Sequence, residues 1–450
     1  MWMPELADDG RPRYLALVDA IASAIETGAL RVGERLPPQR RLAWKLGLNP
    51  STTQQAYREA AARHLVAGEV GRGTYVLAGS REATLFRLKR HDSLGALIDL
   101  STNVPVADPA NQDLEASLQA LLAQGQTHLL DHYLGPQQLL LGRLQGARWL
   151  SNRGLALSAE QLLLCGGAQH ALTLLLQSFC QAGEPVLLEA LTAPGIKAAC
   201  RQLRLPVHGV ALDAQGLLPQ ELDRVARASG ARVLVTTPAL HNPTGACMGE
   251  ARRQAIAEVA RRLGLLVIED DVYGALSEHA PLYPLLGERG MLISSLSKTV
   301  AAGLRLGWIV ASPGLLEQVD PHAGASHWPV SPLNLQLACQ WIEDGTAARR
   351  LAWQREEVAV RWRLARSLLG EALQNASEPS PHVWVAAARG ADRVVAQCRA
   401  QGVEVVPASV FAIGASEVQA VRISLSAAQS RAGLKRGLEV VRQVLAGPPH

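Results

Sequence analysis

Two cations occupy an unusual setting in the segment SSLSKTVAAGLRLG, residues 294–307. Lys298 lies among serines, and Arg305 follows in a run of small and apolar residues. A lysine that is merely hydrated needs no such surroundings. An apolar setting and a nearby cation favour the neutral, nucleophilic form of the amine, which can form a covalent bond with an aldehyde. We therefore expect Lys298 to carry a Schiff base.

Further polar residues stand directly after apolar, strand-like runs of the chain. In sheets with helices on both faces, functional groups gather at the carboxyl ends of the strands, so we expect these residues to meet around Lys298. Taken alone, a turn such as GGA is as readily a tight turn of small residues as a phosphate site. The residues concerned are Ala168 and Gln169 in GGAQH, Asn242 in HNPTG, Asp270 and Tyr273 in EDDVY, and Ser295 in SLSK.

Together these groups meet the requirements of pyridoxal phosphate. Lys298 supplies an amine for the cofactor's aldehyde, and Asp270 supplies a carboxylate for its ring nitrogen. Asn242 and Tyr273 are expected to hydrogen-bond its phenolic oxygen. The dianionic phosphate needs N–H donors and a cation, and the sequence offers Ala168, Gln169, Ser295 and Arg305 for this role.

The runs that carry these residues predict an α/β fold. They are apolar almost throughout, as expected for strands of a mainly parallel sheet that is covered on both faces. Helical stretches such as 168–183 and 250–264 lie between them, which is the alternation typical of an α/β domain. The predicted strands are 161–165, 185–190, 232–238, 265–271, 291–297 and 307–311.

From about residue 96 to residue 445 the chain resembles the fold-type I aminotransferases, in the phosphate turn, HNPTG, DDVY, SLSK and LRLG. The resemblance implies that Tyr133 reaches the phosphate site of a dimer partner. It also implies that Arg422 binds a substrate α-carboxylate through its planar guanidinium, and that Asn103 lies in the segment that crosses such active sites. The chain departs from the family at Ala193, where an aromatic residue commonly stacks on the cofactor ring, and this departure argues against efficient catalysis.

Positive charge is concentrated near the N-terminus. Residues 1–90 carry 14 Lys and Arg against 9 Asp and Glu, whereas the whole chain has 44 against 40. A basic unit of this kind favours nucleic acid as a partner. The same part of the chain predicts helices over 13–30 and 51–66, a short helix between them that ends at Gly47, and a glycine-tipped hairpin. This is the layout of a winged helix-turn-helix.

The basic unit resembles the DNA-binding domain of the GntR family over its whole length, in GERLP, STT and the GRGTYV hairpin. Short polar side chains near the start of the third helix can reach base edges and phosphates, so we expect double-stranded DNA with paired half-sites as the partner. Pro50 stands where the family usually has a basic residue, so one DNA contact is missing. The predicted DNA-binding residues are Arg40, Ser51, Thr52, Thr53 and Gln54 and, in the hairpin, Arg72 and Thr74.

We therefore predict a winged helix-turn-helix domain over 1–78, a linker over 79–95 and an aminotransferase-like, pyridoxal-phosphate-binding domain over 96–450. This architecture resembles the MocR subgroup of transcriptional regulators, which implies a cytoplasmic homodimer with domains exchanged head to tail. The expected function is a DNA-binding regulator that senses pyridoxal phosphate, or an amine or amino-acid aldimine of it, and controls vitamin B6 or amine metabolism. Two alternatives stay open: an aminotransferase with an appended DNA-binding domain, and a regulator whose body binds no cofactor.

Composition argues against several other classes. A hydrophobic fraction of 48% and a charged fraction of 19% are those of an ordinary globular protein. No apolar run approaches the ~18 residues that span a bilayer, and the N-terminus lacks the pattern of a secretion signal. Six cysteines without CxxC spacing suggest neither a metal site nor a disulfide framework. We expect no membrane partner and no metal.

Overall fold

The computed structural model describes residues 2–4, 6, 12–26, 29–30, 34–62, 65–69, 73–76, 97–126, 131–319, 330–375, 377–414 and 417–447. The chain divides into two compact units, residues 1–95 and 96–450. The linker predicted over 79–95 falls outside the described residues. In the part of the chain that the structure describes, no helix has both the length and the apolar character needed to cross a membrane.

The N-terminal unit is a three-helix cluster with a short hairpin. Its apolar core includes Leu17, Ile21 and Leu42, which recur on the inner faces of the helices. The Tyr57 hydroxyl donates a hydrogen bond of 2.6 Å to the carbonyl of Pro37 and so ties the third helix to the segment before the second. The elements are α1 (Arg13–Glu26), α2 (Gln39–Leu46), α3 (Pro50–Ala62) and the antiparallel strands β1 (Val66–Glu69) and β2 (Gly73–Val76).

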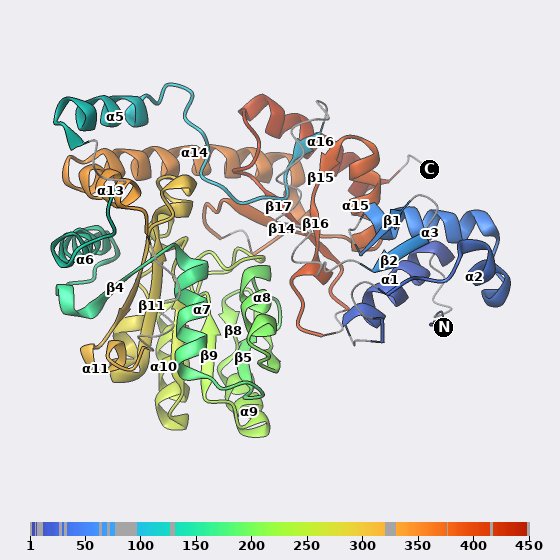
Figure 1. The fold of residues 1–450 in the computed structure, drawn as a ribbon. Coiled ribbons are helices and arrows are strands. Elements are labelled where there is room, and N and C mark those ends of the chain that lie inside the picture. The colour runs from blue at the N-terminus through green and yellow to red at the C-terminus, as the bar shows by residue number, and fades with distance from the viewer. Residues whose placement is uncertain are drawn as a thin grey trace. The chain divides into compact units, whose positions relative to one another are not determined.

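The C-terminal unit is built on a seven-stranded sheet in the order β4-β12-β11-β10-β9-β5-β6 (Figure 1). All neighbouring strands are parallel except that β12 runs antiparallel to both β11 and β4. The predicted fold class, a mainly parallel α/β sheet, is therefore confirmed. In chain order the strands are β4 (Leu162–Cys165), β5 (Val186–Glu189), β6 (Val207–Val210), β9 (Val233–Thr236), β10 (Leu266–Asp270), β11 (Gly290–Ser295) and β12 (Gly307–Ala311).

Helices cover both faces of this sheet, because alternate residues of each strand point to opposite sides. Val186 and Leu188 of β5 pack with α7 (Ala168–Phe179) and α8 (Pro194–Gln202) on one face. Leu187 of the same strand packs with α9 (Pro219–Ser229) and α10 (Glu250–Leu263) on the other. Among the described residues, this part of the unit also contains the helices α5 (Asp113–Ala123), α6 (Pro136–Leu150), α11 (Pro313–Leu316) and α13 (Pro332–Glu343).

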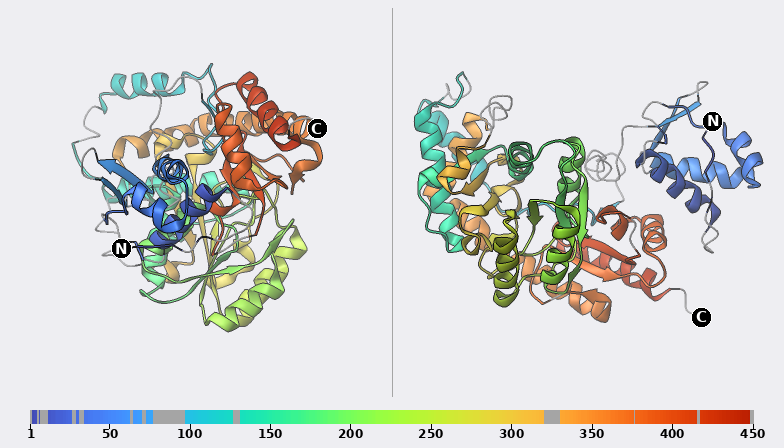
Figure 2. Two further views of the ribbon diagram at one scale, coloured as in Figure 1. Left: turned by 90° about the vertical axis from the view of Figure 1, so that its right-hand side faces the viewer. Right: turned by 90° about the horizontal axis from the view of Figure 1, so that it is seen from below.

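A second, antiparallel sheet lies in the orange-to-red part of the chain (Figure 2), after the long helix α14 (Thr346–Leu369). Its strand order is β13-β14-β17-β16. A short strand near the start of the unit, β3 (Ile98–Asp99), pairs in parallel with β15 (Val403–Glu404) and so joins this part of the fold. A small hairpin is formed by β7 (Leu212–Asp213) and β8 (Gly216–Leu217). The other elements are β13 (Leu373–Gln374), β14 (His382–Ala386), α15 (Ala391–Ala400), β16 (Val406–Pro407), β17 (Ala420–Ser424) and α16 (Arg431–Ala446).

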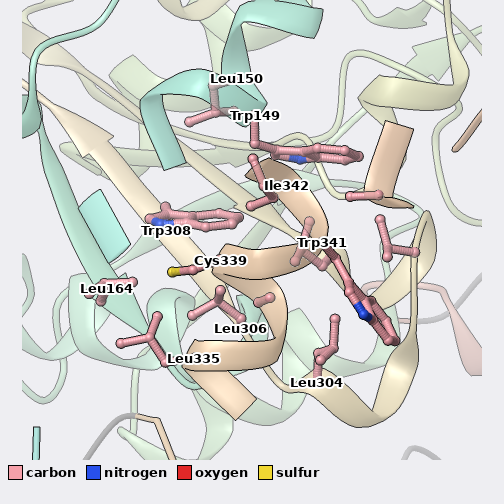
Figure 3. Close-up of a cluster of buried hydrophobic side chains, with 14 of the residues drawn as sticks. Trp149, Leu150, Leu164, Leu304, Leu306, Trp308, Leu335, Cys339, Trp341 and Ile342 are labelled. Carbon is pink, nitrogen blue, oxygen red and sulfur yellow. The ribbon is translucent and has the colours of Figure 1, made fainter. Parts of the chain in front are cut away.

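Trp308 of β12 fills the space between the sheet and α6 (Figure 3). It is fully buried, and its indole Nε1 donates a hydrogen bond of 3.1 Å to the carbonyl of Gly142. Gly146 lies one turn further along α6, and a Cβ added there would be 2.3 Å from the same nitrogen. The indole therefore requires a residue without a side chain at position 146.

We predict that Gly146→Ala destabilises the protein by about 1–3 kcal/mol, because the methyl group forces the indole out of a close-packed site. Urea unfolding followed by tryptophan fluorescence measures the change. Gly314→Ala in α11 is the matched control, since its Cβ meets no described atom within 4 Å. Equal stability of the two variants would show that the site around Trp308 is loosely packed.

Candidate functional site

A basic cradle lies at the N-terminal end of α7. The first amides of a helix have no carbonyl partner within it, and they attract anions. The Arg305 guanidinium donates to the carbonyl of Gly166 (3.2 Å) and to the hydroxyl of Ser297 (3.1 Å). Gly167 precedes the helix with φ of 88°, and a Cβ added to it would be 2.6 Å from Arg305 Nη2. The cradle thus combines the free amides at the start of α7, the cation of Arg305, and a glycine whose missing side chain leaves room for that cation.

Ser297 is a residue of this cradle that the sequence analysis missed. The predicted phosphate residue, Ser295, is buried; its hydroxyl donates to the carbonyl of Leu306 (2.9 Å) and lies 3.1 Å from the hydroxyl of Ser297. Ser297 in turn contacts Arg305 directly. The only signal for it in the sequence is that it belongs to the same SLSK motif.

Lys298 lies in a network of buried polar groups. Its Nζ donates a hydrogen bond of 2.6 Å to the carbonyl of Asn103. The side-chain amide of Asn103 donates to the Tyr273 hydroxyl at 3.0 Å. Burial raises the pKa of Tyr273 to about 12, so its hydroxyl keeps its proton at neutral pH. The structure therefore brings together three of the predicted residues, one from each of three distant segments.

Asp270 ends β10 close to this network. Burial raises its pKa to about 6, while a hydrogen bond from the Val272 amide (3.3 Å) and the charge of Lys298 act in the opposite direction. The carboxylate is therefore mainly ionised at neutral pH. A buried carboxylate in that state is stabilised by a cation or a protonated ring nitrogen.

Arg422 of β17 is buried, with 4% of its surface exposed. Its guanidinium donates to the side chain of Asn242 at 2.8 Å and to the carbonyl of Ser101, and lies 4.9 Å from the centre of the Phe411 ring. Burial lowers its pKa to about 10, so it stays charged at neutral pH. Neither Ser101 nor Phe411 belongs to a recognisable motif, and the sequence analysis missed both.

The other predicted cofactor residues lie at the start of α7 and in the segment before α6. Gln169 donates to the carbonyl of Gly195 (2.9 Å), and Ala168 is the first residue of α7. Tyr133 is 70% exposed in the segment before α6, which is compatible with a role towards a partner subunit. Ala193 precedes α8 and packs with the apolar cluster on the α7 side of the sheet, so position 193 offers a methyl group and no ring.

Glu189 and His241 form a buried pair of an acid and an imidazole, and His241 directly precedes the predicted cofactor residue Asn242 in the chain. One Glu189 carboxyl oxygen accepts hydrogen bonds from the hydroxyl of Thr236 (2.5 Å) and the amide of Thr237 (2.8 Å). The other lies 4.0 Å from His241 Nε2, and neither of these two atoms has a hydrogen-bond partner within the described structure. Burial raises the pKa of Glu189 to about 7 and lowers that of His241 to about 4. At neutral pH Glu189 is therefore about half protonated, whereas an unburied glutamate would be ionised, and the His241 imidazole is uncharged.

The predicted DNA-binding residues differ in how far they are exposed. Arg40 at the start of α2 and Ser51 and Gln54 on α3 are exposed, and Thr52 and Thr74 are half-buried. The prediction for Thr53 needs correction, because its side chain is fully buried. Thr53 precedes Ala56 and Tyr57 by three and four residues, so it shares the inward face of the helix. Arg72 falls outside the described residues.

The start of α3 is fixed by a side-chain cap. Asn49 Oδ1 accepts hydrogen bonds from the backbone amide (3.0 Å) and the hydroxyl (2.8 Å) of Ser51. Capping of this kind stabilises a helix end by satisfying a free amide. The Ser51 hydroxyl can still accept a further hydrogen bond, since it has two lone pairs.

Comparison with known proteins identifies relatives of both units. Residues 96–441 match the aminotransferase class I and II family, and residues 13–76 match the bacterial regulatory proteins of the gntR family. The chain is 27% identical over 459 residues to the uncharacterized HTH-type transcriptional regulator YdeF of Bacillus subtilis, which covers 99% of this chain and 96% of that protein. It is 29% identical over 359 residues to the vitamin B6 salvage pathway transcriptional repressor PtsJ of Salmonella typhimurium, which covers 78% and 80%.

Solved structures show the same fold for the C-terminal unit. The crystal structure of an archaeal alanine:glyoxylate aminotransferase matches with a TM-score of 0.72 at 22% identity, over 81% of this chain and 95% of that chain. The chain therefore belongs to the aminotransferase class I and II family. It joins this domain to a GntR-type regulatory domain, and the two-part architecture expected from the resemblance to the MocR subgroup is confirmed.

Membership of this family implies pyridoxal phosphate as the cofactor, and the residues present fit it. The side chains of Asn103 and Arg422 are buried, and Asn103 Oδ1 and Arg422 Nε have no hydrogen-bond partner among the described residues. The carboxylate of Asp270, at the end of β10, lies near enough to Lys298 for the lysine charge to lower its pKa. The cradle at Arg305 has the donors that a phosphate requires. The charges and hydrogen-bonding groups of these residues therefore suit pyridoxal phosphate.

We predict that Gly167→Ala weakens binding of pyridoxal phosphate about tenfold or more, because its Cβ would displace Arg305 and the positive φ is unfavourable for alanine. Binding of pyridoxal, which lacks the phosphate, should change far less. Gly183→Ala is the control for backbone strain, since its φ is 90° and no described atom lies within 4 Å of the added Cβ. Fluorescence titration with both ligands measures the difference, and an equal loss for both would rule out a phosphate cradle.

We predict that titration of the Glu189 carboxyl makes the stability of the protein depend on pH. Its pKa is higher in the folded than in the unfolded protein. The contribution of Glu189 to the free energy of unfolding is therefore largest below about pH 4.5, and it falls by up to about 3 kcal/mol as the pH rises towards 7. Glu189→Gln removes this loss, because the amide does not titrate. Urea unfolding at pH 5 and pH 7.5 should show the variant gaining stability relative to the wild type at the higher pH. A pH-independent difference would contradict the assignment; exposed Glu258→Gln is the control.

Proposed function

We propose that this protein is a DNA-binding transcriptional regulator that binds pyridoxal phosphate, and that pyridoxal phosphate, alone or combined with an amine or amino acid, changes how it acts on DNA. The observation that carries the proposal is the junction, in one chain, of a GntR-type unit with a polar exposed helix face and a buried site centred on Lys298. The proposed place of action is the cytoplasm. We further propose domain limits of 1–78 and 96–450, joined by a linker.

The residues of the site support binding of the cofactor. Pyridoxal phosphate supplies an aldehyde that reacts with amines and a ring that withdraws electrons when its nitrogen is protonated. Lys298 provides the amine, and Asp270 holds the proton on the ring nitrogen. Tyr273 and Asn242 bind the phenolic oxygen, and Arg305 and the start of α7 bind the phosphate. Arg422, already charged and desolvated, is available for the carboxylate of an amino acid.

The exposed side chains of the N-terminal unit support binding of DNA. Ser51, Gln54 and half-buried Thr52 lie near the start of α3, where a recognition helix contacts base edges. Arg40, exposed at the start of α2, is suited to a phosphate contact. Arg72 and Thr74 of the hairpin are proposed to contact the minor groove or its backbone.

Exposed leucines support a homodimer. On α5, Leu114, Leu118 and Leu122 recur every four residues and are 50%, 37% and 65% exposed. Exposed Leu140 and Leu144 form a similar stripe on α6. Exposed leucines repeated along one helix indicate a surface that a protein partner covers. We propose that a second copy of the chain covers it, with Tyr133 reaching the partner's phosphate site and the DNA-binding domains exchanged head to tail.

The name of PtsJ supports vitamin B6 metabolism as the regulated process, with amine metabolism as a further possibility to test. A second candidate function, an aminotransferase with an appended DNA-binding domain, is favoured by the complete set of polar groups around Lys298. Ala193 argues for sensing instead, because a stacked ring contributes roughly 1 kcal/mol to holding an aromatic ligand. Steady-state assays with amino donors and keto acids distinguish the two: sustained turnover at enzymatic rates supports the enzyme.

We predict that adding pyridoxal phosphate to the full-length protein changes its affinity for DNA from the promoter region next to its own gene, or the footprint or bending of that DNA. Lys298→Ala should lose the visible absorbance of the bound cofactor and the effect on DNA, while it keeps DNA binding itself. Electrophoretic mobility and footprinting assays measure both. If pyridoxal phosphate left affinity, footprint and bending unchanged, sensing would be excluded; if no absorbance appeared in the wild type, the body would bind no cofactor.

Variants of α3 provide the control for the DNA arm of this experiment. Gln54→Ala removes an exposed polar group and should weaken binding of the specific fragment, whereas Thr53→Val changes a buried side chain and should leave specificity unchanged. If Thr53→Val lost specificity and Gln54→Ala did not, the proposal that the exposed face of α3 contacts DNA would be contradicted.

A further inference from the structure

A buried imidazole that no sequence motif indicated contacts the Lys298 network. His382 is the first residue of β14 and has no exposed surface. Its Nδ1 lies 3.1 Å from the side-chain nitrogen of Asn103, and its Nε2 lies 2.9 Å from the carbonyl oxygen of His241. The ring packs edge-on against Tyr273, with centres 5.6 Å apart. His382 thus connects the small sheet to the residues around Lys298.

The partner of Nε2 decides which ring nitrogen carries the proton. A carbonyl oxygen only accepts hydrogen bonds, so Nε2 must be protonated to contact His241. The ring is uncharged at neutral pH, because burial and the nearby charge of Arg422 lower its pKa to about 3; His241 and Lys298 are the other titratable groups that act on it. A neutral imidazole protonated at Nε2 presents a lone pair at Nδ1. That nitrogen can therefore only accept.

The acceptor at Nδ1 fixes the orientation of the Asn103 amide. Only the NH2 group of the amide can donate to it, so Asn103 Nδ2 and not Oδ1 must face His382. The same Nδ2 lies 3.0 Å from the Tyr273 hydroxyl and donates its second hydrogen there. Tyr273 alone would not decide this orientation, because a hydroxyl can donate to an amide oxygen as well as accept from an amide nitrogen. His382 removes the ambiguity.

The orientation of the Asn103 amide determines where the hydroxyl proton of Tyr273 points. Since Tyr273 accepts from Asn103, its own hydrogen has to point away from that amide. If the amide were reversed, the hydroxyl would donate to Asn103 Oδ1 and its proton would be used within the protein. We propose that His382 is a positioning residue that directs the Tyr273 hydroxyl hydrogen towards the phenolic oxygen of the bound ring. This inference rests on the proposed function for the identity of the ligand, but the orientation of the amide does not.

The orientation is tested first in the ligand-free, full-length protein. Histidine labelled with 15N on its ring nitrogens, with His382 assigned by the signal that His382→Asn loses, reports which nitrogen carries the proton. We expect a protonated Nε2 and an unprotonated Nδ1 in His382, unchanged between about pH 6 and pH 8. A proton on Nδ1, or on both nitrogens, would overturn the inference.

The effect on the ligand is tested by a double-mutant cycle with pyridoxal 5'-phosphate as the probe. His382→Phe keeps an edge-on ring but loses the acceptor, and should raise the Kd about tenfold. In a Tyr273→Phe background, which has no hydroxyl to direct, His382→Phe should change the Kd by less than about twofold. His382→Asn, whose Oδ1 takes the place of the Nδ1 acceptor, should recover the wild-type Kd to within about threefold.

Outcomes of the cycle separate positioning from packing. Additive losses in the double variant, or a His382→Asn variant as weak as His382→Phe, would mean that His382 acts as packing only. The bound cofactor's absorbance gives a second readout: losing the donated proton should raise the pH of its visible transition by about one unit in His382→Phe. Failure of the wild type to bind pyridoxal phosphate at all would overturn the proposed function, and the 15N measurement would then decide the orientation alone.

Discussion

The free-energy cost of burying charge at the carboxyl end of β10 is the constraint on which the site depends. Three consecutive carboxyl groups lie there, and each is accommodated differently. Glu269 accepts hydrogen bonds from two backbone amides of the following loop, and Asp271 forms a two-point ion pair with Arg153 at 2.8 and 2.9 Å. Asp270 alone is left beside Lys298. A charge taken out of water has to be paired or hydrogen-bonded, so two of the three carboxyl groups hold the loop while the third stays available to a ligand.

Sequence patterns located the large sheet well and the small sheet poorly. The six predicted strands end within two residues of those observed, because strands covered on both faces are continuous apolar runs. The edge strand β6 is VHGV and half exposed, so it lacks that signal. In the small sheet, β13 and β16 have two residues each, which is too few for any period to be read. They are defined by their pairing with β14 and β17, which the sequence does not reveal.

The site was predictable where residue type and motif coincide, and not where position in space decides. Lys298, Asp270, Tyr273, Asn242 and Arg422 all stand in motifs, and the structure gathers them around one network. His382, in contrast, gains its role from a carbonyl 141 residues away in the chain. Thr53 shows the opposite error: its polar type suggested DNA, but helix periodicity places it inward. Residue type and helical phase have to agree before a polar residue is assigned to a surface.

The contact between Arg422 and the carbonyl of Ser101 gives the site a short covalent path to the N-terminal unit. Ser101 stands just after β3, only six residues beyond the boundary at residue 95, and the Ser101 amide and hydroxyl both donate to Asp99. If Arg422 binds a carboxylate as proposed, its Nε hydrogen, which has no partner among the described residues, is available to the ligand while Nη2 keeps its contact with Ser101. One guanidinium therefore contacts both the segment that follows the first strand of the C-terminal unit and the proposed cofactor residue Asn242.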